Sequence, residues 1–180
     1  MESHRLVLGV IVFGIIFATL VFSRPSITGF VPTETFSQQL DIDVFESQRF
    51  VLSSDSGALK LSALSVSGDV SGSGLVNVYL SDGTAKWLVF SNKKKQGSSM
   101  EHITGFAVSE LDIAPGEKLD RIESLPDGYS AQSGSFSNEC WDTCVLDEGM
   151  FDKRELYLDI IIEPGTSLHV SEIRFSTISE

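Results

Sequence analysis

The sequence predicts an antiparallel β-sandwich preceded by one N-terminal transmembrane helix. An apolar run with no charged residue occupies residues 6–22. The rest of the chain consists of short alternating apolar segments separated by Gly, Pro, Asp and Ser, which is typical of strands and turns. Long Ala/Glu/Lys/Leu helical patterns are absent there. We expect an anchor at residues 1–23, a Ser/Thr/Pro linker at 24–39 and one extracytoplasmic domain at 40–180.

The apolar run begins at Leu6 and ends at Phe22. As a helix it is about 25 Å long, at the short end of what crosses a hydrocarbon core of about 30 Å. The residues before Arg24 form a poor signal-peptidase site, and Pro25 stops the helix. We therefore expect an uncleaved signal anchor in the lipid bilayer of the cell membrane, with a cleaved signal peptide as the alternative. The positive charges on the two sides of the apolar run, Arg5 and Arg24, nearly balance. The expected orientation in the membrane, with the domain outside, therefore depends on the cysteine pair.

The first strands are predicted by alternation. Residues 40–44 alternate apolar and acidic side chains, as a half-buried edge strand does, and residues 49–53 form a short apolar run. Residues 59–66 alternate with a phase slip near Ala63, which indicates a β-bulge. These segments predict the first part of the sandwich.

A hairpin is predicted over residues 75–90, with Asp82 and Gly83 in a type I′ turn. Its return strand is apolar on both faces, which favours a central place in the sheet. The basic residues that follow, 92–99, are expected to form a solvated loop.

The C-terminus is predicted to form a second hairpin. Residues 155–162 read as one strand, residues 163–166 as the turn, and residues 168–175 as the return strand, with a phase slip at Ser171 and Glu172. About eight or nine strands in all, with turns roughly every ten residues, indicate a sandwich.

The two cysteines, Cys140 and Cys144, are too few for a disulfide scaffold or a zinc site. We expect one local disulfide, which favours a domain outside the cytoplasm; two free thiols are the alternative. Trp141 lies between them and Tyr129 lies in another turn. Exposed aromatic side chains stack on sugars or anchor protein interfaces, so both are candidate ligand or partner contacts, with packing within the loop as the alternative.

Clustered carboxylates are the ligands that calcium prefers. Asp41, Asp43 and Glu46 are therefore candidate ligands of a structural calcium ion, and an exposed strand face is the alternative. A second candidate set lies around the cysteine loop and consists of Asp142, Asp147 and Glu148. The three histidines have no metal-ligand spacing.

Charge and motifs exclude several function classes. The net charge of −12 repels phosphates, so no nucleic acid partner is expected. The chain carries no nucleophile elbow, zinc-protease motif or P-loop, so we expect no enzyme activity. A binding role is therefore favoured.

The closing stretch, LYLDIIIEPGTSLHVSEIRFS, resembles the last hairpin of jelly-roll domains of the galactose-binding and carbohydrate-binding-module type. The layout of anchor, linker and β-domain is similar to that of small archaeal surface proteins. The resemblance implies a jelly roll that binds a glycan, often with structural calcium. We expect a cell-surface module that recognises a glycan, another cell-envelope component or a surface protein. The alternative is an oligomeric subunit of a surface assembly or pilin-like filament.

Overall fold

The computed structural model describes residues 33–53, 59–95, 111–146, 152–153 and 155–178. These residues form strands, turns and loops, and all strand pairings among them are antiparallel. Within the described ranges no helix is long and apolar enough to cross a membrane. The expected anchor at residues 6–22 lies outside them.

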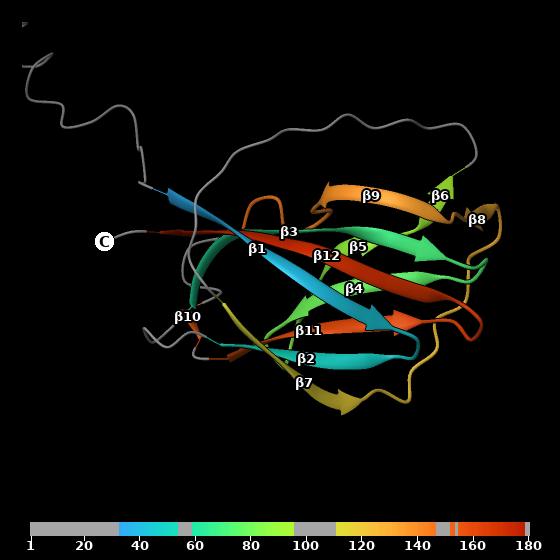
Figure 1. The fold of residues 1–180 in the computed structure, drawn as a ribbon, viewed down its shortest axis with the longest axis horizontal. Coiled ribbons are helices and arrows are strands. Elements are labelled where there is room, and N and C mark those ends of the chain that lie inside the picture. Colours follow the sequence, from blue (N-terminus) through green and yellow to red (C-terminus); the bar gives the residue numbers. More distant parts are fainter. Residues whose placement is uncertain (1–32, 54–58, 96–110, 147–151, 154, 179–180) are drawn as a thin grey trace, which may run out of the picture. The chain divides into compact units, whose positions relative to one another are not determined.

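The first sheet has the strand order β1-β12-β3-β10, and β9 also pairs with β3 (Figure 1). Its strands are β1 (Thr33–Val44), β12 (Ser167–Ile178), β3 (Leu59–Ser71), β10 (Asp152–Lys153) and β9 (Gly134–Glu139).

The second sheet has the order β5-β4-β11-β2-β7. Its strands are β5 (Lys86–Ser91), β4 (Val76–Ser81), β11 (Glu155–Ile162), β2 (Gln48–Ser53) and β7 (Asp112–Lys118). A separate ribbon pairs β6 (Lys93–Lys95) with β8 (Tyr129–Ala131).

One hydrophobic core lies between the two sheets. Alternate side chains of each strand point inward, as the two-residue period of a strand requires. The first sheet contributes residues such as Leu64 and Ile173, and the second contributes Val78, Leu158 and Ile160, all buried in one cluster. The predicted all-β, sandwich-like fold is confirmed.

Most connections between consecutive long strands pass from one sheet to the other. β1, β3 and β12 belong to the first sheet, whereas β2, β4 and β11 belong to the second. The predicted C-terminal hairpin is therefore wrong in its pairing: both strands exist, but β11 pairs with β2 and β4, while β12 pairs with β1 and β3. Each strand has the apolar side chains that a sheet with a buried inner face requires. The alternation pattern is therefore the same whether the two strands pair with each other or lie in different sheets.

The β4–β5 hairpin is confirmed, but its turn differs from the prediction. Gly83 has a φ of 89°, whereas Asp82 does not have a positive φ, so the turn is not type I′. The Asp82 carboxylate instead accepts hydrogen bonds from the backbone N–H groups of Thr84 and Ala85, at 2.9 and 2.8 Å. This Asx-type arrangement supports a longer loop.

Both predicted bulges are confirmed. Ala63 and Leu61 pair with consecutive residues of β12, which leaves Ser62 as the extra residue. The second irregularity falls between Val170 and Glu172, at Ser171. The first strand, in contrast, begins earlier than expected. Residues 33–39, predicted as linker, pair with β12, because Phe36 packs on Phe175 with ring centroids 5.3 Å apart.

The outer face of the second sheet holds a buried acid. Asp159 is fully buried, and Arg49 donates to its carboxylate through Nε and Nη2, at 2.6 and 3.0 Å; Lys86 also binds it. Burial raises the pKa of Asp159, but the hydrogen bonds from Arg49 and Lys86 outweigh burial and hold the pKa below its ordinary value. The Asp159 hydrogen bond likewise raises the pKa of Arg49.

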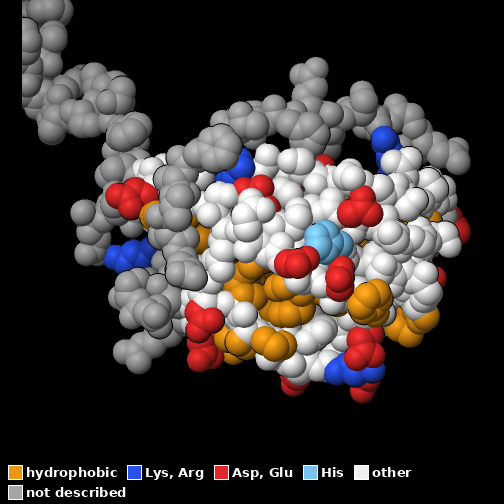
Figure 2. Space-filling model, viewed as in Figure 1, with side chains coloured by type: hydrophobic (Ala, Val, Ile, Leu, Met, Phe, Trp, Pro, Cys, Tyr) orange, Lys and Arg blue, Asp and Glu red, His pale blue; other side chains and the backbone are white. Residues whose placement is uncertain are grey.

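The surface seen in Figure 2 carries the negative charge expected from the composition. Acidic side chains lie beside a histidine on this face, and hydrophobic side chains gather beneath them. His169 Nδ1 lies 3.0 Å from an oxygen of Asp43 and 3.9 Å from an oxygen of Asp41.

Candidate functional site

A pocket of about 520 Å³ lies at the side of the sandwich where strands of both sheets and the β6–β8 ribbon meet. Its walls come from residues 90–94 at the end of β5 and start of β6, residues 129 and 132–136 around β8 and β9, and residues 139 and 141. This volume falls in the range of small-molecule sites. Both aromatic candidates from the sequence, Tyr129 and Trp141, line it.

Two stacked phenylalanines support the pocket. The rings of Phe90 and Phe136 have centroids 3.8 Å apart and planes inclined by 13°. Phe136 lies opposite Gly68 in the β3–β9 register. A Cβ on Gly68 would lie 3.1 Å from the Phe136 ring and 2.1 Å from the His169 carbonyl oxygen. Glycine is therefore required there mainly because the β12 backbone lies so close, and its lack of a side chain also leaves room for the Phe136 ring.

Trp141 is mounted on the edge of β5. Its backbone N–H donates to the carbonyl of Val89 at 3.0 Å, and that of Asp142 donates to Leu88 at 2.7 Å. The Asp142 carboxylate accepts the N–H of Leu88 at 3.1 Å. The expected central place of this strand is wrong, because β5 is the last strand in its sheet. These bonds satisfy its outer edge.

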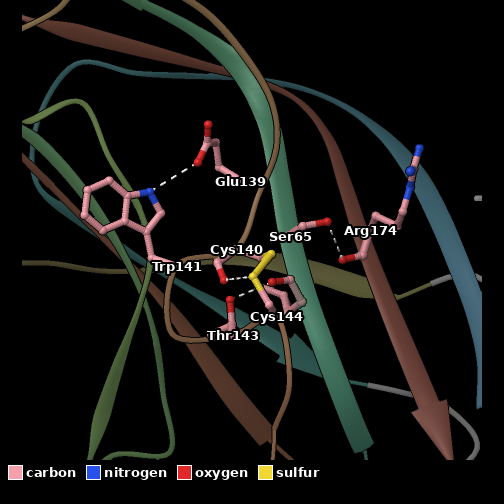
Figure 3. Close-up of a disulfide and its surroundings, with 8 residues drawn as sticks. Ser65, Glu139, Cys140, Trp141, Thr143, Cys144 and Arg174 are labelled. Atoms are coloured by element: carbon pink, nitrogen blue, oxygen red, sulfur yellow. Dashed lines mark hydrogen bonds between the residues drawn. A yellow bond between two sulfur atoms is a disulfide. The ribbon is translucent and has the colours of Figure 1, made fainter. Parts of the chain in front are cut away.

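The disulfide loop joins the two sheets. Cys140 and Cys144 are bonded, with Cα atoms 4.8 Å apart, as expected (Figure 3). Thr143 is fully buried between them, and its hydroxyl donates to the carbonyl of Leu64 in β3 at 2.6 Å, while the Leu64 N–H donates to the Thr143 carbonyl at 2.9 Å. Since Trp141 is bonded to β5, the loop spans from one sheet to the other and fixes the Trp141 backbone.

Figure 3 shows the Trp141 indole pointing away from the disulfide. Its Nε1–H donates to the Glu139 carboxylate at 3.2 Å, and the residue is 40% exposed. Tyr129 is 37% exposed, and the Lys93 ammonium lies 5.5 Å from the centre of its ring. The pocket therefore presents two aromatic surfaces, each with a charged group beside it.

Asn92 links the segments that form the pocket through hydrogen bonds. It is buried, its side-chain oxygen accepts the Val76 N–H at 2.8 Å, and its amide nitrogen donates to the carbonyls of Gly74 and Gln132, at 2.9 and 3.2 Å. Its own N–H and carbonyl bond with Val76 and Gln132. A side chain with both donors and an acceptor satisfied in this way fixes three segments relative to one another.

The prediction of a solvated basic loop at residues 92–99 is wrong for its first part. Asn92 is buried and Lys93–Lys95 form β6, paired with β8. Composition alone suggested a loop, because three consecutive lysines show no strand pattern and the paired strand, β8, lies more than 30 residues farther along the chain. Residues 96–99 lie outside the described part.

The acidic candidates for calcium are not brought together. Asp41 and Asp43 flank His169, whereas Glu46 binds Lys118. Among the described residues, no group of three or more His, Cys, Asp or Glu side chains is arranged to hold a metal ion. In the second set, Asp142 binds the backbone of Leu88, while residues 147 and 148 lie outside the described part.

The pocket combines aromatic rings with polar side chains. Aromatic rings offer apolar faces, and amides, hydroxyls and charged groups supply hydrogen bonds with fixed directions. Sequence patterns pointed to Trp141 and Tyr129 through their turn positions. They did not reveal Phe136 or Glu139, which reach the pocket because β9 pairs with the distant β3, nor Gln132, whose backbone is bonded to Asn92.

The chain matches no protein-family model, and no curated protein or solved structure is significantly similar to it. Its function is therefore inferred from the pocket itself.

Proposed function

We propose that this protein is a membrane-anchored cell-surface module whose pocket binds a glycan. The observation that carries the proposal is the meeting of Trp141 and Tyr129 in one pocket of about 520 Å³ beside side-chain amides and hydroxyls. A sugar ring has an apolar C–H face and a rim of hydroxyls. An aromatic ring can cover the first, and Gln132, Ser133 and Ser135 can bond with the second.

The fold assigned to this module is a jelly roll. The strand orders support it: β1-β12-β3-β9 faces β5-β4-β11-β2, and the chain alternates between the sheets from β1 to β4 and again from β11 to β12. Two such four-stranded sheets with crossing connections are the arrangement of double Greek-key sandwiches, which include lectin domains. In this assignment β7 is an added edge strand.

Two features support the proposed location at the outer side of the cell membrane. The apolar run at residues 6–22 supports a single-pass anchor. The Cys140–Cys144 bond supports an oxidising compartment, since disulfides persist mainly outside the cytoplasm. The module in this proposal faces outward and acts without catalysis.

Binding to an oligosaccharide panel tests the proposal. The full chain, purified in detergent, is compared with Trp141→Ala and Tyr129→Ala. We expect each variant to bind at least about tenfold more weakly, or about 1.4 kcal/mol. Phe45→Ala is the matched control, because Phe45 is 69% exposed but does not line the pocket. Absence of saccharide binding by the wild type, or equal losses in all three variants, would contradict a glycan site.

A subunit of a surface assembly is the second candidate function. The feature that favours it is β1, a strand of 12 residues that in the described part pairs only with β12. An open edge of this length can accept a strand from another copy. Ordered polymers of the full chain in electron micrographs would support this candidate; a monodisperse monomer at high concentration would exclude it.

A further inference from the structure

We propose that the glycan bound in this pocket is acidic, and that Lys93 takes its carboxylate or sulfate group while Lys94, on the other face of β6, adds positive charge at the pocket edge. The inference rests on the proposed function and names the ligand class for the same site. Both lysines line the pocket. The protein carries a net charge of −12, so two neighbouring cations that form no ion pair with a described residue are unusual for this chain.

Five other cations in the described part of the chain are held by carboxylates. Arg49 and Lys86 bind Asp159, and Lys118 binds Glu46. Arg121 binds Glu123, and Arg174 binds Glu172, at 3.1 and 3.2 Å. These pairs leave little net positive field around the side chains concerned.

Lys93 and Lys94 differ from these cations. Neither forms an ion pair with another residue that the structure describes. Lys93 is half-buried and Lys94 is exposed. A half-buried ammonium without a counter-ion interacts more strongly with an incoming anion than one in bulk water. The positive charge of the site is therefore available to bind an anionic ligand.

The β6–β8 pairing places this charge beside an aromatic surface. Lys95 is directly opposite Tyr129 in the register, so Lys93 is its diagonal neighbour on the same side of the ribbon. The Lys93 ammonium accordingly lies 5.5 Å from the centre of the Tyr129 ring. A sugar stacked at Tyr129 thus has its substituents within reach of a cation.

Glu139 makes the two ends of the pocket differ in charge. Its carboxylate, bonded to the Trp141 indole, also lines the pocket, where it repels anions and accepts hydrogen bonds from hydroxyls. A ligand with its acidic group at the lysines and its hydroxyls at Glu139 satisfies both. A uniformly charged polymer does not, because it would bring negative charge to Glu139 as well.

Matched saccharide pairs test the inference. The full chain in detergent is titrated with an oligosaccharide that ends in one sialic acid and with an oligosaccharide that carries one sulfate group, each beside its uncharged counterpart. Polyglutamate serves as an anion that is not a sugar. The expected result is at least about fivefold tighter binding of an acidic member than of its counterpart, with the preference falling as salt is raised.

Charge-neutral variants assign the preference to the two lysines. Lys93→Gln should reduce the preference for the acidic member over its neutral counterpart at least about threefold, and Lys94→Gln should reduce it less, because Lys94 lies on the other face of β6. Lys118→Gln removes the same charge outside the pocket and should leave the preference intact.

Each outcome separates this inference from the proposed function. Equal binding of acidic and neutral members overturns the acidic ligand and leaves glycan binding standing. Binding of polyglutamate as tight as that of the acidic sugar, or an equal effect of Lys118→Gln, also overturns it. No saccharide binding at all overturns both proposals.

Discussion

Asp159 places a negative charge where no solvent reaches it, on the outer face of β11. Two cations converge on it: Arg49 of the adjacent strand β2, and Lys86 of β5, which lies two strands away on the other side. A buried ion pair need not stabilise a fold relative to an apolar substitute, but removing one partner leaves the others unpaired. This carboxylate therefore fixes how β2, β11 and β5 lie relative to one another.

Replacing Asp159 with Asn should destabilise the domain by about 3 kcal/mol, because two partly buried cations lose their shared counter-charge. Urea denaturation of both proteins measures the difference. Asp43→Asn is the control: Asp43 is exposed and carries the same chemical change, so a shift within about 0.5 kcal/mol is expected there. Equal shifts for the two variants would contradict this role.

Asp159 should also make the unfolding free energy of the domain depend on pH in the acidic range. The pKa of Asp159 is lower in the folded protein than the value of about 3.9 for an unfolded chain. Its stabilisation is therefore complete above that value and is lost as the pH falls through the folded pKa. The gap in unfolding free energy between wild type and Asp159→Asn should narrow below about pH 4.

At the scale of elements, the disulfide loop is held mainly by backbone bonds. Thr143 binds β3 and Trp141 binds β5, independently of the sulfur atoms. Closing a loop this small removes only about 2 kcal/mol of unfolded-chain entropy. The disulfide therefore refines the shape of the loop more than it maintains the fold.

Replacing Cys140 and Cys144 together with Ser should lower the melting temperature by about 4–8 °C, which corresponds to about 2 kcal/mol for a domain of this size. Saccharide affinity should fall as well, because the Trp141 loop gains freedom. Thermal melts and binding titrations measure the two effects, with reduced wild type as the control. Complete unfolding of the variant, or free thiols in native wild-type protein, would contradict the prediction.

At the scale of the whole molecule, the domain begins with the first residues of β1. The compact unit starts at Pro32, and Phe36 packs on Phe175. A fragment of residues 32–180 should therefore fold alone, with a β-rich circular dichroism spectrum. A fragment of residues 40–180 should be less stable by at least about 2 kcal/mol, because it loses the burial of Phe36. Equal stability of the two fragments would show that residues 33–39 contribute nothing.

Much of the strand pattern could be predicted from alternation, because inward and outward positions differ in polarity. Val78 and Leu158 are examples, and so are the two bulges. The partner of each strand could not, since a buried inner face has the same pattern in either sheet. The strands before and after Thr166 therefore read as a hairpin, although they belong to different sheets.

The candidate site was predictable in part. Trp141 and Tyr129 stood out because large aromatics in turn regions are seldom needed for a core. Asn92 and Phe136 did not, since a single Asn before a basic run, or a Phe among serines, carries no local signal. Their roles arise from long-range pairing that brings β9 onto β3 and Gln132 onto Asn92.

The pairing of the first strand with the last has a mechanical consequence. Thr33 lies opposite Ile178, and the register continues to Val44 opposite Leu168. Antiparallel hydrogen bonds run perpendicular to the strands, so a pull on the chain before Thr33 along the axis of β1 loads the whole ladder in shear. The tension then passes through β12 to β3 in the interior of the first sheet. A domain held by this end of its chain bears force across many bonds at once, instead of opening one bond at a time.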